Sequence, residues 1–343
     1  MNTKNQAPRK PSAGKPAGKS GSVKPNYNKS GKAPVRNGVK PTGKPNAAKA
    51  AKKTAPARDP SDPNINWYPG HMKKATRMIE DNLKLVDAVI EIRDARIPES
   101  SRNPDVATLS GDKPRMVILN RVDQADPEVT ALWRRALESE GCSVLETDCK
   151  SGRGVREFPA AARELLSEQI ARWEERGLVG RQMRFMVLGI PNVGKSSFIN
   201  RLAGRKAAEA GDRPGVTRGK QWITLEGGIQ LLDTPGILWP KLDTPQTGLS
   251  LAWTGAINDE ILDRELVACR LLELLKDRYP HAIEERYKLT PEEGEQGWEL
   301  LERLGRRRGF LVSGGEVDTE RACRILLDEY RAGLLGRISL ERP

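Results

Sequence analysis

The sequence predicts an α/β fold, in which a mostly parallel sheet is covered by helices on both faces and is followed by an α-helical domain. Between residues 64 and 235, short β-branched apolar runs alternate with segments of helical periodicity, as expected for parallel strands joined by helices. Beyond about Thr254 the strand signals end and only amphipathic helical patterns continue. We therefore expect a tail at residues 1–62, an α/β domain at 63–250 and an α-helical domain at 255–343.

The first 58 residues differ from the rest in charge. They hold 12 Lys and 3 Arg but no Asp or Glu, whereas the whole chain carries a net charge of only +12. Proline and glycine recur every few residues and apolar side chains are scarce, so the segment cannot bury enough surface to offset the entropy of ordering it. We expect a disordered tail that holds polyanions loosely. A tail that only aids solubility is the alternative.

The composition excludes several classes of protein. No apolar run approaches the ~18 residues that a membrane span needs, so we expect a soluble protein without a membrane partner. The cysteines form no Cys-x-x-Cys pair, which argues against a zinc site or a disulfide framework and fits reduced thiols in the cytoplasm. They are Cys142, Cys149, Cys269 and Cys323.

Apolar periodicity places the elements in order along the chain. In the α/β domain it predicts helices at 72–85, 128–138 and 155–176, and strands at 86–92, 115–119, 143–146 and 185–188. A helix then begins at Lys195, followed by strands at 221–225 and 229–232. In the C-terminal domain, helices are predicted at 259–278, 294–304 and 319–335.

The chain is organised around residues 183–200. An apolar strand breaks at Gly189, and Gly194, Lys195 and Ser196 open a helix, so the loop fits the pattern Gly, four residues, Gly, Lys, Ser. In this pattern backbone N–H groups surround a phosphate chain, the lysine reaches the β- and γ-phosphates, and the serine hydroxyl binds Mg²⁺. The predicted nucleotide-binding residues here are Pro191, Asn192, Val193, Gly194, Lys195, Ser196 and Ser197. A glycine turn that merely carries a lysine is the alternative.

A second motif, Asp233-Thr-Pro-Gly236, ends a buried strand about forty residues after the phosphate loop. There the Asp233 carboxylate would reach the Mg²⁺ shell and the Gly236 N–H would meet the γ-phosphate. Thr217, which lies between the two motifs, is the natural second Mg²⁺ ligand. A plain strand-to-turn exit is the alternative for this motif alone. We predict catalytic roles for Lys195, Thr217 and Gly236, and Mg²⁺ contacts for Ser196, Thr217 and Asp233.

A third motif, Asn120-Arg-Val-Asp123, ends another buried strand and predicts a guanine contact. The Asp123 carboxylate can accept hydrogen bonds from N1–H and N2–H₂ of guanine, a pair of donors that adenine lacks. Arg121 stands where lysine is usual, and its aliphatic stem can still cover the base. The alternative is a capping Asn with an unrelated turn Asp. The later stretch Asp148-Cys-Lys150 stands where Ser-Ala-Lys is usual, and this departure weakens the contact with the base edge. The predicted base-binding residues are Asn120, Arg121, Asp123, Asp148, Cys149 and Lys150.

The base-recognition segments precede both the phosphate loop and the Asp233-to-Gly236 motif, which we call the γ-phosphate sensor. This order is unusual for a GTPase. A site is assembled in space, so joining the old chain ends and opening another surface loop preserves it. We therefore predict a circularly permuted P-loop GTPase domain. The sensor then lies close to the linker into the helical domain, so the nucleotide state can be passed directly to that domain.

With these motifs the chain resembles the circularly permuted GTPases of the ribosome biogenesis GTPase A (YlqF/RbgA) type, from about Asn64 to the C-terminus. The resemblance rests on Trp67-Tyr-Pro-Gly-His-Met72, Asp94-Ala-Arg-Ile-Pro98, Ser101-Arg-Asn-Pro104, the loop Gly189 to Ser196, Pro214-Gly-Val-Thr217, Asp233-Thr-Pro-Gly-Ile-Leu238 and Leu311-Val-Ser-Gly-Gly-Glu-Val317. It implies hydrolysis of GTP to GDP coupled to late assembly of the large ribosomal subunit, with the C-terminal helices contacting ribosomal RNA of the precursor. We expect a cytoplasmic monomer that uses Mg²⁺.

The resemblance also bears on catalysis. Ile237 directly follows Gly236, where related enzymes carry a water-orienting glutamine, so slow intrinsic turnover is expected. His71 looks like the family residue that replaces this glutamine when the ribosome presents it, and a structural His in a Pro-Gly turn is the alternative. Asn192 looks like the asparagine with which related GTPases hold K⁺, whose charge could stand in for an arginine finger.

A basic turn in the C-terminal domain is the first choice for contact with RNA phosphates, and a solvated charge run is the alternative. Its residues are Arg303, Arg306, Arg307 and Arg308. Two other functions stay open from sequence. One is an RNA-binding scaffold that binds nucleotide but barely hydrolyses it, which Ile237 would favour. The other is a different RNA-associated NTPase, such as an ATPase or a kinase.

Overall fold

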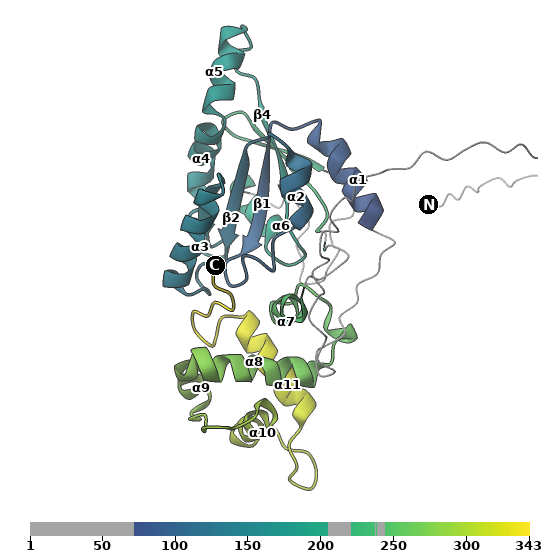
Figure 1. The fold of residues 1–343 in the computed structure, drawn as a ribbon, viewed down its shortest axis with the longest axis vertical. Helices are drawn as coiled ribbons and strands as arrows, with labels where there is room; N and C mark the ends of the chain where they lie inside the picture. Colours follow the sequence, from purple (N-terminus) through teal and green to yellow (C-terminus); the bar gives the residue numbers. More distant parts are fainter. Residues whose placement is uncertain (1–71, 205–220, 237, 239–243) are drawn as a thin grey trace, which may run out of the picture. The chain divides into compact units, whose positions relative to one another are not determined.

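The computed structural model describes residues 72–204, 221–236, 238 and 244–343, all within one compact unit. In this part of the chain a six-stranded sheet has the order β3-β2-β1-β4-β6-β5 (Figure 1). Neighbouring strands are parallel except at the edge, where β5 runs antiparallel to β6. The strands are β1 (Ala88–Asp94), β2 (Arg115–Asn120), β3 (Ser143–Thr147), β4 (Met183–Leu188), β5 (Gln221–Leu225) and β6 (Ile229–Asp233). The predicted mostly parallel sheet is confirmed.

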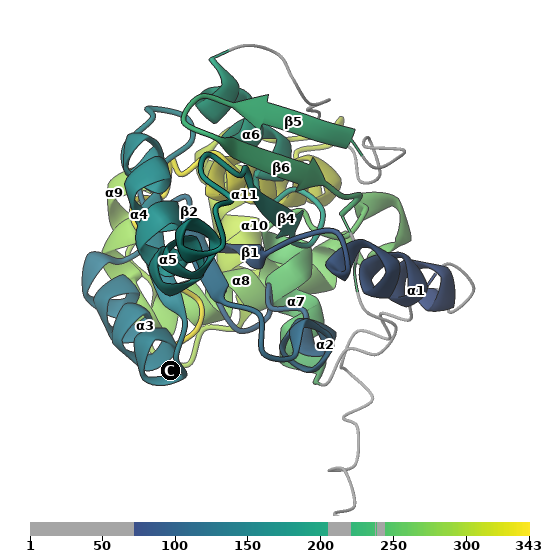
Figure 2. The same ribbon diagram turned by 90° about the horizontal axis from the view of Figure 1, so that it is seen from above.

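Helices cover both faces of this sheet, as Figure 2 shows from above. They are α1 (Met72–Leu83), α2 (Pro104–Ser110), α3 (Pro127–Ser139), α4 (Phe158–Leu165), α5 (Ser167–Glu175) and α6 (Lys195–Ala203). Because strand side chains alternate between faces, Ile90 and Phe185 share one core cluster with Phe158 of α4 and Phe198 of α6. The opposite face packs against α1, α2 and α3 in two smaller clusters.

The sequence pattern misses three short helices, namely α2, α7 (Pro245–Trp253) and α9 (Pro280–Tyr287). Each begins with a proline at its first turn, where the missing N–H would have no partner in any case. None is long enough to show a clear apolar stripe. A proline preceded by Asn103 or Thr244, whose side chains cap α2 and α7, was the available signal.

Two predicted long helices are interrupted in the structure. The predicted helix at 155–176 consists of a 3-10 turn (Val155–Glu157), α4 and α5, because Leu166 has φ −103° and ψ 12° and leaves the helical conformation. The predicted helix at 259–278 consists of a 3-10 turn (Asp259–Ile261) and α8 (Arg264–Arg278). The Asp263 carboxylate accepts a hydrogen bond from the Leu266 N–H at 3.0 Å, which starts α8 anew.

The C-terminal helices lie beyond the carboxyl ends of the strands in Figure 1. Here α8 packs against α10 (Gly297–Arg307) and α11 (Thr319–Arg331), which begin and end within a few residues of the predicted bounds. The Trp253 Nε1–H at the end of α7 donates to the Val267 carbonyl of α8 at 2.8 Å. In the part of the chain that the structure covers, no helix combines the length and apolar character needed to cross a membrane.

The strand register brings the predicted motifs to one edge of the sheet. Asp94, Asn120 and Thr147 are direct partners at the carboxyl ends of β1, β2 and β3. Asp233 ends β6 opposite Val187 of β4, immediately before the phosphate loop. Because β1 also pairs with β4, the motifs from both halves of the α/β region lie at the carboxyl ends of the parallel strands, where parallel sheets bind ligands.

Candidate nucleotide-binding site

The phosphate loop between β4 and α6 has a constrained backbone. Asn192 and Gly194 have φ values of 60° and 101°, a region that favours glycine. A Cβ atom on Gly189 would lie 2.7 Å from the Ile92 carbonyl oxygen of β1, so the loop begins too close to the sheet for a side chain. Lys195 then starts α6, whose first N–H groups have no partners within the helix and face the loop.

Lys195 lies inside this loop. Its Nζ donates hydrogen bonds to the carbonyls of Gly189 at 3.2 Å and Ile190 at 3.4 Å, and its side chain is buried. Burial lowers the pKa of Lys195 to about 8, against the attraction of the nearby Asp233 carboxylate. Burial likewise raises the pKa of Asp233 to about 6, against the attraction of Lys195. Both groups therefore gain from a ligand that supplies the opposite charge.

Asp233 has the chemistry expected of a cation site. It is fully buried, and neither carboxylate oxygen has a hydrogen-bond partner of good geometry within the described residues. A buried carboxylate without partners is costly. Mg²⁺ with its bound waters would satisfy both oxygens, so the residues present fit this ion.

Gly236 joins the sensor to the phosphate loop. A Cβ atom built on it would lie 3.0 Å from the Lys195 Nζ and 3.0 Å from the Pro191 backbone nitrogen. The segment after β6 therefore lies directly against the phosphate loop, and glycine leaves room for the phosphate that Gly236 is predicted to meet.

Asn120 connects the two halves of the site. Its Nδ2 donates to the Val193 carbonyl in the phosphate loop at 2.8 Å. Its Oδ1 accepts hydrogen bonds from the Thr147 hydroxyl at 3.2 Å and from the Cys149 N–H at 3.3 Å. A single buried amide thus holds together the end of β2, the end of β3 and the phosphate loop.

Arg121 also contacts the phosphate loop. Its Nη2 donates to the Asn192 carbonyl at 2.9 Å, and its Nε lies 3.7 Å from the Asp94 carboxylate. Asp94 is itself paired with the buried Arg96 guanidinium at 2.7 Å. Although burial opposes it, the Arg96 charge holds the pKa of Asp94 below its usual range. The Arg121 guanidinium therefore braces the loop backbone, and only its stem remains for a base.

The Asp148-Cys-Lys150 stretch forms a turn beside Asn120. The Asp148 carboxylate accepts hydrogen bonds from the N–H groups of Lys150 at 2.8 Å and Ser151 at 3.2 Å, so its side chain shapes the turn itself. Burial raises the pKa of the Cys149 thiol to about 12, so this thiol stays protonated. The Lys150 side chain is exposed.

The remaining predicted site residues fall into two groups. Ser196 is half-buried and Ser197 is exposed at the start of α6, while Pro191 and Val193 are buried in the loop. His71, Thr217 and Ile237 lie outside the described residues, as does the basic tail. Their predicted roles stay predictions.

Contacts between the phosphate loop and the helical region had no signal in the sequence. The Asn192 Nδ2 donates to the Gly255 carbonyl, just after α7, at 2.7 Å. On the same segment, Arg331 of α11 donates to the Ala252 carbonyl at 2.8 Å and pairs with Asp259 at 2.7 Å. The loop predicted to hold phosphate therefore touches the segment that α11 anchors.

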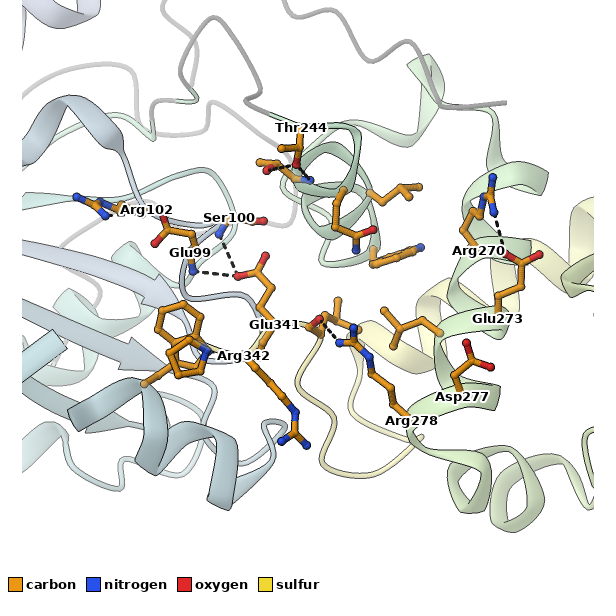
Figure 3. A pocket seen from close by; sticks show the side chains of 18 of the residues that line it. Glu99, Ser100, Arg102, Thr244, Arg270, Glu273, Asp277, Arg278, Glu341 and Arg342 are labelled. Atoms are coloured by element: carbon orange, nitrogen blue, oxygen red, sulfur yellow. Dashed lines mark hydrogen bonds and ion pairs between the residues drawn. The ribbon is translucent and has the colours of Figure 1, made fainter. Parts of the chain in front are cut away.

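A groove of about 790 Å³ lies away from these residues, between the 99–104 segment, α7, α8 and the last residues of the chain (Figure 3). In it the Glu341 carboxylate accepts hydrogen bonds from the N–H groups of Glu99 at 2.9 Å and Ser100 at 3.1 Å. Acidic and basic side chains alternate along its walls, so no single ligand charge is favoured. Its significance is structural: the C-terminal residues fold back onto the α/β region.

Comparison with known proteins identifies the family. A family model described as 50S ribosome-binding GTPase matches residues 184–290. The chain is 45% identical over 280 residues to ribosome biogenesis GTPase A of Priestia megaterium, which covers 81% of this chain and 97% of that protein. The chain belongs to the ribosome biogenesis GTPase A family.

Solved structures agree with this placement in the ribosome biogenesis GTPase A family. A GDP-bound YlqF matches with a TM-score of 0.56 and 29% identity, over 78% of this chain and 99% of that one. A GNP-bound YlqF from T. maritima matches with a TM-score of 0.54 at the same identity, over 79% and 98%. The resemblance drawn from the motifs, the permuted GTPase fold and the GTPase activity are thereby confirmed. The roles of individual residues stay predictions.

Proposed function

We propose that this GTPase binds a precursor of the large ribosomal subunit in its GTP-bound state and leaves after ribosome-stimulated hydrolysis, late in assembly. Family membership supports the ribosomal role. The observation that carries the GTPase mechanism is the hydrogen bond from Asn120 to the Val193 carbonyl. It joins the predicted base-recognition motif to the phosphate loop although the two lie in the permuted order, which supports a shared site.

In the proposed mechanism, the buried Lys195 ammonium and the loop N–H groups stabilise the charge that develops on the phosphates. Ser196, Asp233 and Thr217 would hold Mg²⁺, which neutralises the β- and γ-phosphate oxygens. Gly236 would contact the γ-phosphate through its N–H. The Asp233 oxygens, which have no hydrogen-bond partner of good geometry among the described residues, support the metal assignment.

Guanine selection is proposed for Asp123. Its side chain is exposed in the loop that follows β2, three residues after Asn120, and the base would lie beside this loop. Its carboxylate matches the two donors of the guanine edge. Asp148, Cys149 and Lys150 would close the other side of the base, with Cys149 fixed by its N–H bond to Asn120.

Two further roles belong to the catalytic step. His71 would orient the attacking water once the ribosome presents it, in place of the glutamine that Ile237 replaces. Asn192 would hold K⁺ through its side-chain oxygen, and its Nδ2 bond to the Gly255 carbonyl supports a fixed orientation of that amide. Rapid hydrolysis would then require both the particle and K⁺.

The helical region is proposed to contact ribosomal RNA. Three of the four arginines named for this purpose are engaged within the protein. Arg303 pairs with Glu295 at 2.6 Å, Arg306 with Glu302 at 2.7 Å, and Arg308 with Glu329 at 2.9 Å. Arg307 is exposed and is the strongest remaining candidate for a phosphate contact in that turn. We further propose that the protein acts as a cytoplasmic monomer.

The decisive experiment measures GTP hydrolysis by the full chain with and without large ribosomal subunits. We expect slow turnover alone, strong stimulation by subunits in K⁺ buffer, and no stimulation of Lys195→Ala. A wild type that binds subunits without being stimulated would be a scaffold, not the proposed enzyme. Stimulation that is equal in Na⁺ buffer would remove K⁺ from the mechanism.

A second experiment tests the base. ATP should not compete with GTP for the wild type, and Asp123→Asn should shift preference toward xanthosine triphosphate, because an amide can donate to the extra carbonyl of xanthine. Effective competition by ATP would show a different NTPase.

A further inference from the structure

Residues 337–339 form hydrogen bonds with the loop at residues 120–126, which carries Asp123. Arg337 donates two hydrogen bonds to this loop, from Nη2 to the Val122 carbonyl at 3.0 Å and from Nε to the Ala125 carbonyl at 3.0 Å. These carbonyls lie on either side of Asp123. One guanidinium therefore clamps the backbone that presents the predicted guanine-binding carboxylate.

Neighbouring residues extend this contact. The Ile338 N–H donates to the Gln124 carbonyl at 2.8 Å, and the Asp126 N–H donates to the Ser339 hydroxyl at 3.1 Å. The Tyr279 hydroxyl, between α8 and α9, donates to the Ser339 carbonyl at 3.0 Å. Ile338 and Ser339 are each only 2% exposed, so the segment is built into the fold and is not a loosely attached end.

The segment is also fixed on its far side. The Leu340 N–H donates to the Arg96 carbonyl at 2.9 Å, and the Trp133 Nε1–H donates to the Glu341 carbonyl at 3.2 Å. Glu341 in turn accepts the two backbone N–H groups seen in Figure 3. Arg337 therefore projects from an anchored segment onto the loop, where its two hydrogen bonds on either side of Asp123 add to the contacts that Ile338 and Ser339 make with Gln124 and Asp126.

Asp123 depends on such support. Its side chain is exposed, and no hydrogen bond with the described residues holds it in place. The backbone of the loop therefore sets the region that the carboxylate can reach, since an exposed side chain turns about its own bonds from a fixed Cα position. Hydrogen bonds weaken steeply as their angle departs from linearity, so a small shift of this backbone would cost one or both bonds to guanine.

We infer that Arg337 is a positioning residue for guanine selection, which holds the Val122 and Ala125 carbonyls so that the Asp123 carboxylate meets the base edge. This inference rests on the proposed role of Asp123. It assigns part of the nucleotide specificity to a residue of the C-terminal segment, outside the α/β region that supplies the base and phosphate motifs.

The test compares GTP with inosine triphosphate, which keeps N1–H but lacks the 2-amino group that Asp123 would bind. Affinities of the full chain for both nucleotides are measured by equilibrium titration. Arg337→Ala should weaken GTP binding by about tenfold and inosine triphosphate binding by less, because only GTP loses a second bond. The preference for GTP should therefore fall. A purely structural loss would weaken both nucleotides equally.

Two variants serve as controls. Arg337→Lys keeps a donor within reach of the carbonyls and should restore part of the preference. Arg342→Ala removes an exposed arginine five residues further on, which donates no hydrogen bond to the 120–126 loop, and should behave as wild type. Arg337→Met keeps most of the side-chain volume but none of the donors, and should lower the preference in the same direction if Arg337→Ala does not fold.

The outcomes separate the two hypotheses. A wild type without preference for GTP over inosine triphosphate would overturn the role of Asp123 and this inference with it. A wild-type preference that persists in folded Arg337→Ala, or in Arg337→Met where Arg337→Ala does not fold, overturns the inference alone and leaves the proposed function standing.

Discussion

The side-chain amide of Asn120 donates a 2.8 Å hydrogen bond to the backbone carbonyl of Val193. The two residues lie 73 positions apart, and their contact joins the end of β2 to the phosphate loop, the two parts of the predicted nucleotide site. Because Asn120 is 3% exposed and makes three hydrogen bonds, it has little freedom to reorient.

Replacing this amide should uncouple the two motifs. In Asn120→Asp the carboxylate cannot donate to the Val193 carbonyl, so two acceptors would face each other. We expect binding of GTP and GDP to weaken by about 2 kcal/mol or more, as measured by titration calorimetry. Asn258→Ala, which removes an amide that caps the 3-10 turn at 259–261, is the matched control. Unchanged nucleotide affinity in Asn120→Asp would contradict the joint role of this residue.

Gly194 should tolerate no side chain. Its φ is 101°, and a Cβ atom would lie 2.3 Å from the Asn120 Nδ2. Gly194→Ala should therefore reduce GTP affinity by about tenfold or more, through strain and displacement of Asn120. Gly204→Ala is the comparison, since Gly204 has φ 62° but no described residue within 4 Å of its Cβ position. That variant should lose about 1 kcal/mol of stability and keep its affinity; equal losses in both would show that only backbone strain matters.

The pKa of Asp233 predicts a pH dependence of stability for the nucleotide-free protein. Its folded value, raised to about 6 by burial, exceeds the ordinary 3.8, so the folded state binds more protons between these values. Stability contributed by Asp233 should be fully present below about pH 4 and lost as the pH rises through 6. Denaturant unfolding at pH 4 to 7 measures this slope. Asp233→Asn should lack it, and an identical slope in both proteins would assign it elsewhere.

Substitutions of Tyr330 should distinguish the contribution of its ring to stability from that of its hydroxyl group. The Arg96 guanidinium lies 5.1 Å from the centre of the Tyr330 ring, whereas the buried Tyr330 hydroxyl has no hydrogen-bond partner within the described residues. Tyr330→Phe keeps the cation–π contact and removes the unsatisfied hydroxyl, so it should be neutral or stabilising. Tyr330→Leu should cost about 1–3 kcal/mol in urea unfolding. A destabilised Tyr330→Phe would show that the hydroxyl has a partner in solution.

The candidate nucleotide site could be proposed from sequence because its motifs are local, and the roles of its residues stay predictions. Lys195 and Asp123 stand in short motifs whose spacing reflects a strand, a tight turn and a helix, and each motif ends a buried strand that periodicity reveals. Since parallel strands present their carboxyl ends at one edge, placing the strands also brought the motifs together. The register of Asp94, Asn120 and Thr147 bears this out.

The contacts that support the site were not accessible in the same way. Arg337 and Val122 are 215 residues apart, and a single arginine after a glycine is indistinguishable in sequence from a surface residue. The basic turn of α10 shows the opposite error. Four arginines in six positions suggest a free basic patch, but the acidic partners of Arg303 and Arg308 come from the preceding segment and from α11. Charge runs do not reveal such pairing across helices.

The distance in sequence between Arg337 and the loop that it clamps also orders events during synthesis. Translation proceeds from the N-terminus, so the 120–126 loop and the phosphate loop both leave the ribosome well before Arg337 has been joined to the chain. A nascent chain can assemble the phosphate cradle early, but on the role inferred for Arg337 its choice of base is still relaxed at that stage. On that inference, each molecule acquires its selectivity for guanine only once residues 337–339 have left the ribosome and packed against the 120–126 loop.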